Sequence, residues 1–246
     1  MGGLVPIPAT GRTFRVAYTV RLSDADVAGR VRLDALARYL QDAAIDDVQE
    51  TGWGAPEHLW VLRSVRIDVV RPMLHDGEVG VVTWGSSFSA LAAGRRWSLT
   101  GDAGGSVEVD SIWIHLDADA RPARIGAGFN GYAEAAQGRA ASTKLTLEPP
   151  SIEGDRPVWP LRVTDVDRMG HVNNAAYWAA VEQRLSDRFD LRRPLRACLD
   201  YRHPIDLGER VELAVDGDHL WLVVDGDVRS AAWLDPDGAR DPEQLT

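Results

Sequence analysis

The chain has 246 residues, of which 45% are hydrophobic and 26% charged, which is typical of a globular protein with a full core. Its formal net charge of -10 argues against a general affinity for nucleic acid or for anionic membranes. The single cysteine, Cys198, excludes an internal disulfide framework and a cysteine-based zinc site. We find no long apolar run and no signal-peptide pattern, so we expect no membrane span and a cytoplasmic location.

The first half of the chain predicts one long helix and several strands. Residues 15–22 alternate as a strand, and the polar turn SDAD follows at residues 23–26. Apolar residues at spacings of three and four then predict an amphipathic helix from Leu33 to Thr51, which Gly52 ends. Segments bounded by Gly, Pro or Asp predict further strands at residues 60–72, 77–90, 94–100 and 106–117. This is an α+β pattern, in which an antiparallel sheet wraps around the helix.

The same order returns in the second half after a change in composition. Residues 126–155 are poor in large apolar residues and predict a linker, with a short helix possible at residues 131–138. The linker separates an N-terminal domain at residues 1–125 from a C-terminal domain at residues 156–246. In the second domain, the pattern predicts a strand from Val158, a helix over residues 173–189, and strands within 196–215, 219–226 and 228–235.

The two halves are copies of one unit. RLSDADVAGRV at residues 21–31 aligns without a gap with RVTDVDRMGHV at residues 162–172. VRIDVVRPMLHDGEV also matches ACLDYRHPIDLGERV if one residue is deleted. The copies differ at one informative position, because the first has Arg30 where the second has His171.

The stretch DVDRMGHVNN, residues 165–174, gathers the residues best suited to chemistry. Asp167 and His171 are four residues apart in a turn, so both could face one substrate atom and activate water or attack a carbonyl. Asn173 and Asn174 stand where a helix begins, and the free N–H groups there suit a developing oxyanion. Helix capping and turn formation would explain the same residues without chemistry. The other histidines are scattered without ligand spacing, so we expect no metal and no cofactor.

Here the residues resemble a known family. DVDRMGHVNNAAYW resembles the DxDxxxHVNNxxYxxW element of hotdog-fold thioesterases. LQDAAIDDVQETG and RRWSLT resemble the N-terminal repeat of plant and bacterial acyl-ACP thioesterases. The resemblance implies two tandem hotdog domains, each a long helix wrapped by an antiparallel β-sheet. It also implies hydrolysis of a fatty acyl thioester, with the chemistry in the second repeat and the acyl pocket contributed largely by the first.

The resemblance assigns individual residues only in part. Asp167 falls on the family's catalytic Asp and His171 on its catalytic His, whereas Met169 stands where the plant enzymes have an Asn. Pro204 falls where they have a Glu, and Ile205 at the position of a once-suspected Cys. Two polar positions are therefore lost. Asp167 is left as base or nucleophile, and Asn173 as the nearest remaining amide.

Further residues are candidates for substrate contact. Asn174 and Tyr177 belong to the motif, while Gln41 and Asp42 lie on the first helix and could reach the thioester from the facing repeat. A solvated helix face would equally explain Asp42.

The expected partner is an acyl carrier protein or acyl-CoA, bound by a monomeric double hotdog or a homodimer. Because an acyl carrier protein is acidic, as is this chain, a local arginine patch would be needed to bind it. The candidates for that patch are Arg192, Arg193, Arg196, Arg202, Arg95 and Arg96.

Two other functions remain open. A hotdog hydratase or dehydratase uses similar acyl substrates. Its sequence element, however, has a His five residues after the Asp and an acidic residue two positions further on. Here the spacing is four, and Asn173 stands at the third position. A catalytically weak acyl-binding protein would explain Met169 and Pro204.

Overall fold

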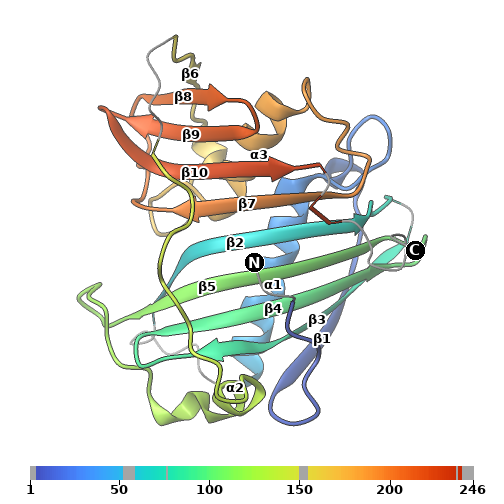
Figure 1. Ribbon diagram of the computed structural model, residues 1–246, viewed down its shortest axis with the longest axis vertical. Coiled ribbons are helices and arrows are strands. Elements are labelled where there is room, and N and C mark those ends of the chain that lie inside the picture. Colours follow the sequence, from blue (N-terminus) through green and yellow to red (C-terminus); the bar gives the residue numbers. More distant parts are fainter. Residues whose placement is uncertain (1–3, 52–58, 76, 150–154, 237, 240–246) are drawn as a thin grey trace.

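A single antiparallel sheet of ten strands organises the molecule (Figure 1). The computed structural model describes residues 4–51, 59–75, 77–149, 155–236 and 238–239. The strand order is β1-β3-β4-β5-β2-β7-β10-β9-β8-β6, so the first half of the chain supplies one side of the sheet and the second half the other. The halves join where β2 (Leu59–Arg71) pairs antiparallel with β7 (Leu195–Tyr201).

The first half follows the predicted pattern closely. Helix α1 runs over Leu33–Thr51, as its apolar stripe predicts, and Gly52 lies outside the described residues. Strand β1 is preceded by a short irregular segment, and a 3-10 turn at Leu22–Asp24 follows it in place of the predicted strand end. The remaining strand bounds in this half are Thr13–Thr19 for β1, Glu78–Phe88 for β3, Ala92–Gly101 for β4 and Ser106–Leu116 for β5.

The second half departs from the predicted pattern at two elements. Helix α3 covers Asn174–Leu185, four residues short of the predicted end, because Ser186 caps it and the chain then turns. Strand β6 is only Val158–Trp159, since Pro160 has no N–H to continue the ladder. The short helix α2 (Asn130–Ala135) lies within the predicted linker. The other strands are β8 (Val211–Asp216), β9 (His219–Val224) and β10 (Asp227–Asp235).

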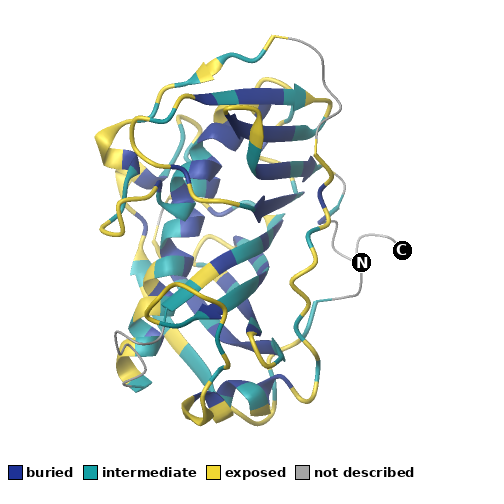
Figure 2. Ribbon diagram, turned by 90° about the vertical axis from the view of Figure 1, so that its left-hand side faces the viewer, coloured by how far each residue is buried: buried dark blue, intermediate teal, exposed yellow. Residues whose placement is uncertain are grey.

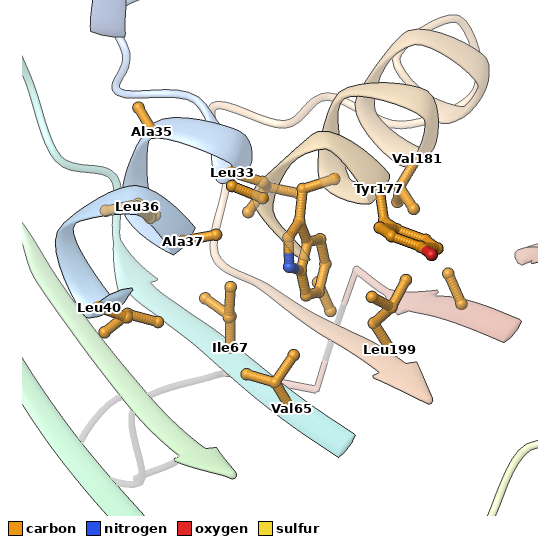
Figure 3. Close-up of a cluster of buried hydrophobic side chains, with 14 of the residues drawn as sticks. Leu33, Ala35, Leu36, Ala37, Leu40, Val65, Ile67, Tyr177, Val181 and Leu199 are labelled. Carbon is orange, nitrogen blue, oxygen red and sulfur yellow. The ribbon is translucent and has the colours of Figure 1, made fainter. Parts of the chain in front are cut away.

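Both long helices pack on the same face of the sheet (Figures 1 and 2). In the close-up of Figure 3, apolar side chains of α1 and α3 converge on those of β2 and β7. Each fully buried leucine, isoleucine or valine side chain of this core stabilises the fold by about 1.5–3 kcal/mol. This core crosses the line where the halves meet, so the two helices hold the halves together. Its labelled members are Leu33, Ala35, Leu36, Ala37, Leu40, Val65, Ile67, Tyr177, Val181 and Leu199.

The segment after α2 crosses the opposite face of the sheet (Figure 1). The backbone N–H groups of Thr146 and Leu147 both donate to the Asp200 carboxylate at 3.0 Å, and the Trp221 indole donates to the Glu148 carbonyl at 2.8 Å. Beneath this segment, Cys198 is buried, and burial raises the pKa of its thiol to about 12. The thiol is therefore a packing group and not a nucleophile.

A buried carboxylate connects the two halves across the line where they meet. Asp68 on β2 is opposite Arg196 on β7 and accepts hydrogen bonds from Arg196 at 2.7 Å and 3.0 Å. Arg66, two residues before Asp68, donates to the same carboxylate at 2.5 Å and 2.9 Å. Burial alone would raise the pKa of Asp68, but these two guanidinium groups hold it below its usual value.

Within the described residues, no helix is long and apolar enough to cross a membrane.

Candidate active site

The loop before α3 is a tight turn that presents His171. The N–H of Asp167 donates to the His171 carbonyl at 2.9 Å, and Val166 and Val172 pair as an isolated bridge. Gly170 has φ of 86°, a left-handed conformation that glycine adopts without strain. Local turn geometry therefore places His171 directly before α3, with its side chain about half exposed at 47%.

The imidazole of His171 is paired with Asp206, a residue that the sequence analysis did not select. His171 Nδ1 and Asp206 Oδ1 are 2.5 Å apart. The two residues also form an isolated antiparallel bridge, and the neighbouring N–H of Val172 donates to the Ile205 carbonyl at 2.8 Å. Asp206 is anchored by its own N–H, which donates to Glu209 at 2.8 Å. A carboxylate on Nδ1 favours the tautomer that leaves Nε2 available as a base.

Asp167 does not share this contact. Its Oδ1 accepts a hydrogen bond from the Met169 N–H at 2.8 Å, which closes the turn. Among the described residues, the hydrogen-bond partner of the His171 ring is Asp206. The two side chains of this turn therefore have different hydrogen-bond partners, and that Asp167 and His171 face one substrate atom stays a prediction.

The two asparagines have different positions. Asn173 is the N-cap of α3, and its Oδ1 accepts from the Ala175 N–H at 2.8 Å. Asn174 is the first residue of the helix, and its carbonyl accepts from the Tyr201 hydroxyl at 2.9 Å. Tyr177 is 3% exposed and packs edge-on against Tyr201, so it lies in the core and does not line the two cavities of 570 and 860 Å³ described below.

A cavity of about 570 Å³ begins beside Asn174 and follows α1. This volume suits a small-molecule ligand. Arg168, from the His171 turn, and Gln41 also contribute to its wall, whereas Asp42 does not. Asp42 lies on another side of α1, where partial desolvation of its carboxylate and then the charge of Asp46 raise its pKa. The rest of the lining comes from Ala44, Ile45, Val48, Gln49, Leu59, Trp60, Phe88, Ala93, Gly94, Arg95, Trp113, Phe129 and Tyr132.

The first copy of the repeat has a different set of residues at the equivalent place. Arg30 forms an isolated bridge with Leu74, just as His171 does with Asp206. Arg30 is 4% exposed and donates to Asp26 at 3.1 Å and to Glu182 of α3 at 2.5 Å. The histidine and its carboxylate are therefore both specific to the second copy.

Glu182 also occupies the start of α1. Its Oε2 accepts a hydrogen bond from the Leu33 N–H at 2.8 Å, and Leu33 is the first residue of that helix. With the alignment of the repeats, which shifts residue numbers by 141, Leu33 corresponds to Asn174 and Glu182 to Gln41. The N-terminus of α1 is thus matched with a carboxylate, Glu182 of the second copy, whereas the N-terminus of α3 is matched with a neutral amide, Gln41 of the first copy.

A second large cavity, of about 860 Å³, lies in the equivalent position beside Arg30. With the same shift of 141, its lining residues Glu182, Ser186, Phe189 and Asp190 correspond to Gln41, Ile45, Val48 and Gln49 of the first cavity. Charged groups dominate this second lining, which includes Arg30, Arg32, Asp34, Arg162, Asp187, Arg188 and Arg192. The repeated fold therefore forms a cavity at each of these two equivalent positions, and the one beside Asn174 has the more apolar wall.

Comparison with known proteins gives the family. The N-terminal domain of acyl-ACP thioesterases matches residues 11–127, and the C-terminal domain of acyl-ACP thioesterases matches residues 153–229. The chain belongs to the acyl-ACP thioesterase family. It is therefore a thioesterase, as the HVNN motif and the LQDAA segment predict.

Relatives of this acyl-ACP thioesterase family member cover nearly its whole length. Proteins from two strains of Mycobacterium tuberculosis, both described as uncharacterized, are 30% identical over 237 residues, which is 94% of this chain and 95% of theirs. Among solved structures, the 12:0-ACP thioesterase from Umbellularia californica is 18% identical with a TM-score of 0.72, covering 96% of this chain and 100% of that one. An acyl-ACP thioesterase from Bacteroides thetaiotaomicron is 16% identical with a TM-score of 0.70, covering 91% and 98%. These likenesses show a shared hotdog fold.

The predicted arginine patch is largely absent from the surface of this thioesterase. Arg95 and Arg96 are 9% and 2% exposed, because they lie within β4. Arg196 is paired with Asp68, and Arg202 donates to the Leu147 carbonyl. The two exposed candidates of the six are Arg192 and Arg193.

Among the described residues, no group of three or more His, Cys, Asp or Glu side chains is arranged to hold a metal ion.

Proposed function

We propose that this thioesterase releases a fatty acid from an acyl-acyl carrier protein or acyl-CoA in fatty acid biosynthesis, and that it does so at His171. The observation that carries the proposal is the 2.5 Å pair of His171 and Asp206, which is present in one copy of the repeat and absent from the other. The thioester would lie between His171 and the N-terminus of α3, with its acyl chain in the 570 Å³ cavity.

In this proposal His171 acts as a general base. Asp206 accepts a hydrogen bond from the Nδ1–H of His171, so Nε2 is unprotonated and can take a proton from water as the water attacks the thioester carbonyl. The same proton then passes to the departing thiolate, which leaves as the thiol. Asp167 stays a candidate for base or nucleophile, acting through its second carboxylate oxygen while Oδ1 holds the Met169 N–H.

The N-terminus of α3 would hold the oxyanion. Support comes from the first copy, where the equivalent N–H of Leu33 binds a carboxylate oxygen of Glu182 at 2.8 Å. Because backbone N–H groups at a helix start favour negative charge, the N–H of Asn174 would stabilise the tetrahedral intermediate in the same way. Gln41, on the facing helix, would contact the thioester as a neutral amide.

We further propose that the chain consists of two hotdog units in tandem, with boundaries near residues 1–125 and 156–246 and a linker at 126–155. The order of the sheet supports this division, since five strands and one long helix come from each half.

The test is thiol release from saturated acyl thioesters on both carriers. We expect hydrolysis by the native protein and a loss of roughly 100-fold or more in His171→Ala, the usual contribution of a general base. His219→Ala is a matched control, because His219 also pairs with an aspartate, Asp218, at 2.8 Å but lies on β9. Full activity of His171→Ala would overturn the assignment. Hydration of an enoyl thioester without thiol release would instead identify a hydratase.

A further inference from the structure

Asp206, the partner of His171, lies on the β7–β8 loop, residues 202–210. Its side chain is 60% exposed, and His171 is also about half exposed. A pair of mobile, solvated side chains gains little from meeting, because both lose conformational freedom when they do. Holding Asp206 in place before a substrate binds would therefore favour its contact with the imidazole.

Glu209 fixes the backbone of Asp206. Its Oε2 accepts a hydrogen bond from the Asp206 N–H at 2.8 Å, and the Glu209 N–H donates to the Asp206 carbonyl at 3.2 Å. Gly208, between them, has φ of 96°, a conformation that glycine adopts without strain. These two reciprocal hydrogen bonds close a turn, and the turn determines the direction in which the Asp206 side chain leaves the backbone.

Arg229 of β10 contacts the β7–β8 loop at both ends. Its Nη2 donates to Glu209 Oε1 at 3.1 Å, and its Nη1 donates to the Pro204 carbonyl at 3.4 Å. The Arg229 carbonyl also accepts from the N–H groups of Arg202 and His203, at 2.8 Å and 3.2 Å. One residue therefore connects the two ends of the loop that carries the proposed partner of the base.

A β-bulge gives Arg229 this position. β10 pairs with β9 in one register up to Val228 and in another from Ser230, so Arg229 is the extra residue between them. Bulges re-aim side chains and are common next to active sites. The exposed fraction of the side chain falls from 60% at Asp206 to 27% at Glu209 and 21% at Arg229, so the loop is held from its more buried side.

The first copy of the repeat has a different residue at the place of Arg229. Tyr201 and its equivalent Val69 are opposite the residues that directly follow Arg229 and Ser106, so Ser106 of β5 corresponds to Arg229. A serine has one hydroxyl donor and cannot hold a carboxylate and a carbonyl at once, as a guanidinium does. Among the described residues, this arrangement is therefore specific to the second copy, as are the proposed base and its carboxylate.

We propose that Arg229 and Glu209 are positioning residues for the thioesterase reaction, which hold Asp206 against Nδ1 of His171 and act on the reaction only through Asp206. A catalytic group that is held in advance has less freedom to lose in the transition state, and small displacements of such a group lower the rate strongly. This inference rests on the proposed hydrolysis at His171 and adds two residues that do not touch the substrate.

A double-variant cycle tests whether Arg229 acts through Asp206. In thiol-release assays, Arg229→Met should lower kcat about tenfold and leave KM within about twofold, because only the orientation of the base is lost. In an Asp206→Ala background, the same substitution should have almost no further effect. An equal loss of kcat in both backgrounds would overturn the inference. No hydrolysis by the native protein, or full activity of His171→Ala, would overturn the proposed function instead.

Arg32→Met is a matched control for the loss of an arginine that braces a turn. Arg32 of the first copy also holds one carboxylate, that of Asp34 at 2.9 Å, and one backbone carbonyl, that of Ala25 at 3.0 Å. Its side chain is 30% exposed, which is comparable with Arg229. Arg32→Met should keep the native kcat, and a loss as large as that of Arg229→Met would contradict a specific role for Arg229.

Two variants of Glu209 separate its hydrogen bond from its removal. Glu209→Gln keeps an oxygen that can accept from the Asp206 N–H, whereas Glu209→Ala does not. We expect Glu209→Ala to lower kcat about tenfold and Glu209→Gln to recover most of that loss. A native kcat in Glu209→Ala would contradict the role of Glu209.

¹⁵N NMR of the His171 ring tests the positioning without catalysis. The signals are assigned by their loss in His171→Ala, at a pH where the ring is neutral. In the native protein the proton should lie mainly on Nδ1, because Asp206 accepts a hydrogen bond there. In Arg229→Met and Glu209→Ala the tautomer balance should move toward that of Asp206→Ala. If Arg229→Met does not fold, Glu209→Ala alone decides, and a native tautomer balance in that variant would overturn the inference.

Discussion

The carboxylate of Glu182 accepts a hydrogen bond from the backbone N–H of Leu33, and these two residues belong to different copies of the repeat. The same carboxylate is held by Arg30 at 2.5 Å. A negative oxygen from the protein itself therefore occupies the helix N-terminus in the first copy. At the N-terminus of α3, the residue equivalent to Glu182 is Gln41 of the first copy, which leaves the N–H of Asn174 to a substrate in our proposal.

The variant Glu182→Ala tests whether the ion pair of Glu182 with Arg30 contributes to stability and not to catalysis. Glu182→Ala should lower the free energy of unfolding by about 3 kcal/mol, because it leaves Arg30 buried without its closest counter-charge. Its kcat on acyl thioesters should stay close to native. Urea unfolding and thiol-release assays measure the two quantities. The double variant Arg30→Met with Glu182→Leu should recover most of the stability, and a loss equal to that of the single variant would contradict this account.

The pairing of His171 predicts the relative importance of two aspartates. Asp206→Asn should lower kcat about tenfold or more, because the imidazole loses a charge-assisted hydrogen bond that orients it. Its thermal stability should change little, since the Asp206 side chain is 60% exposed. Asp167→Asn is the companion variant. If Asp167 acts as nucleophile or base, its kcat should fall further than that of Asp206→Asn, by about 100-fold or more.

Asn173 should act as a helix cap. Asn173→Ala removes the acceptor of the Ala175 N–H and should destabilise the protein by about 1 kcal/mol, measured by urea unfolding. Asn173→Ser should restore most of this stability, because serine also caps helices. Activity should follow the same pattern, with both variants within a few-fold of native. A large loss of kcat in Asn173→Ser at native stability would show instead that the amide takes part in the reaction.

The Asp68 carboxylate should make stability depend on pH in the acid range. Its pKa in the folded protein lies below the ordinary 3.8, so its stabilising effect is complete above that value and is lost as the pH falls below it. At neutral pH, Asp68→Asn should lower the free energy of unfolding by about 3 kcal/mol, since Arg66 and Arg196 lose their shared partner.

The difference between native protein and Asp68→Asn should shrink as the pH falls below the ordinary 3.8, because the native carboxylate then gains a proton at its lowered pKa. Asp190→Asn is the control, because Asp190 forms an exposed pair with Arg192 at 2.9 Å that should contribute little. A constant difference between native protein and Asp68→Asn across this pH range would contradict the assigned pairing.

Local patterns predicted most of the fold. The apolar stripe of α1 predicted its bounds, and the turn residues predicted the strands that follow it. The pattern could not predict that α3 ends at Leu185, because Ser186 and Asp187 continue a polar turn that resembles one more turn of helix. Nor could it predict one continuous sheet, since the pairing of β2 with β7 depends on tertiary structure.

The candidate site was only partly predictable for a related reason. His171 stands out in a local motif, whereas its partner Asp206 is 35 residues away and is recognised only once the two segments pair. A signal was available, because the alignment of the repeats places Asp206 opposite Leu74. The burial of Arg95 could not be read from the sequence, since RRW within a strand looks the same whether it faces solvent or a cavity.

The union of the halves through β2 and β7 has an evolutionary consequence. In a dimer of identical chains, every mutation appears twice, so a residue that closes one site would close the other as well. Here each half is encoded separately and inherits its own mutations. One half can therefore retain His171 and Asp206 while the other keeps Arg30 and Leu74, and a substitution at one of these two equivalent positions leaves the other unchanged.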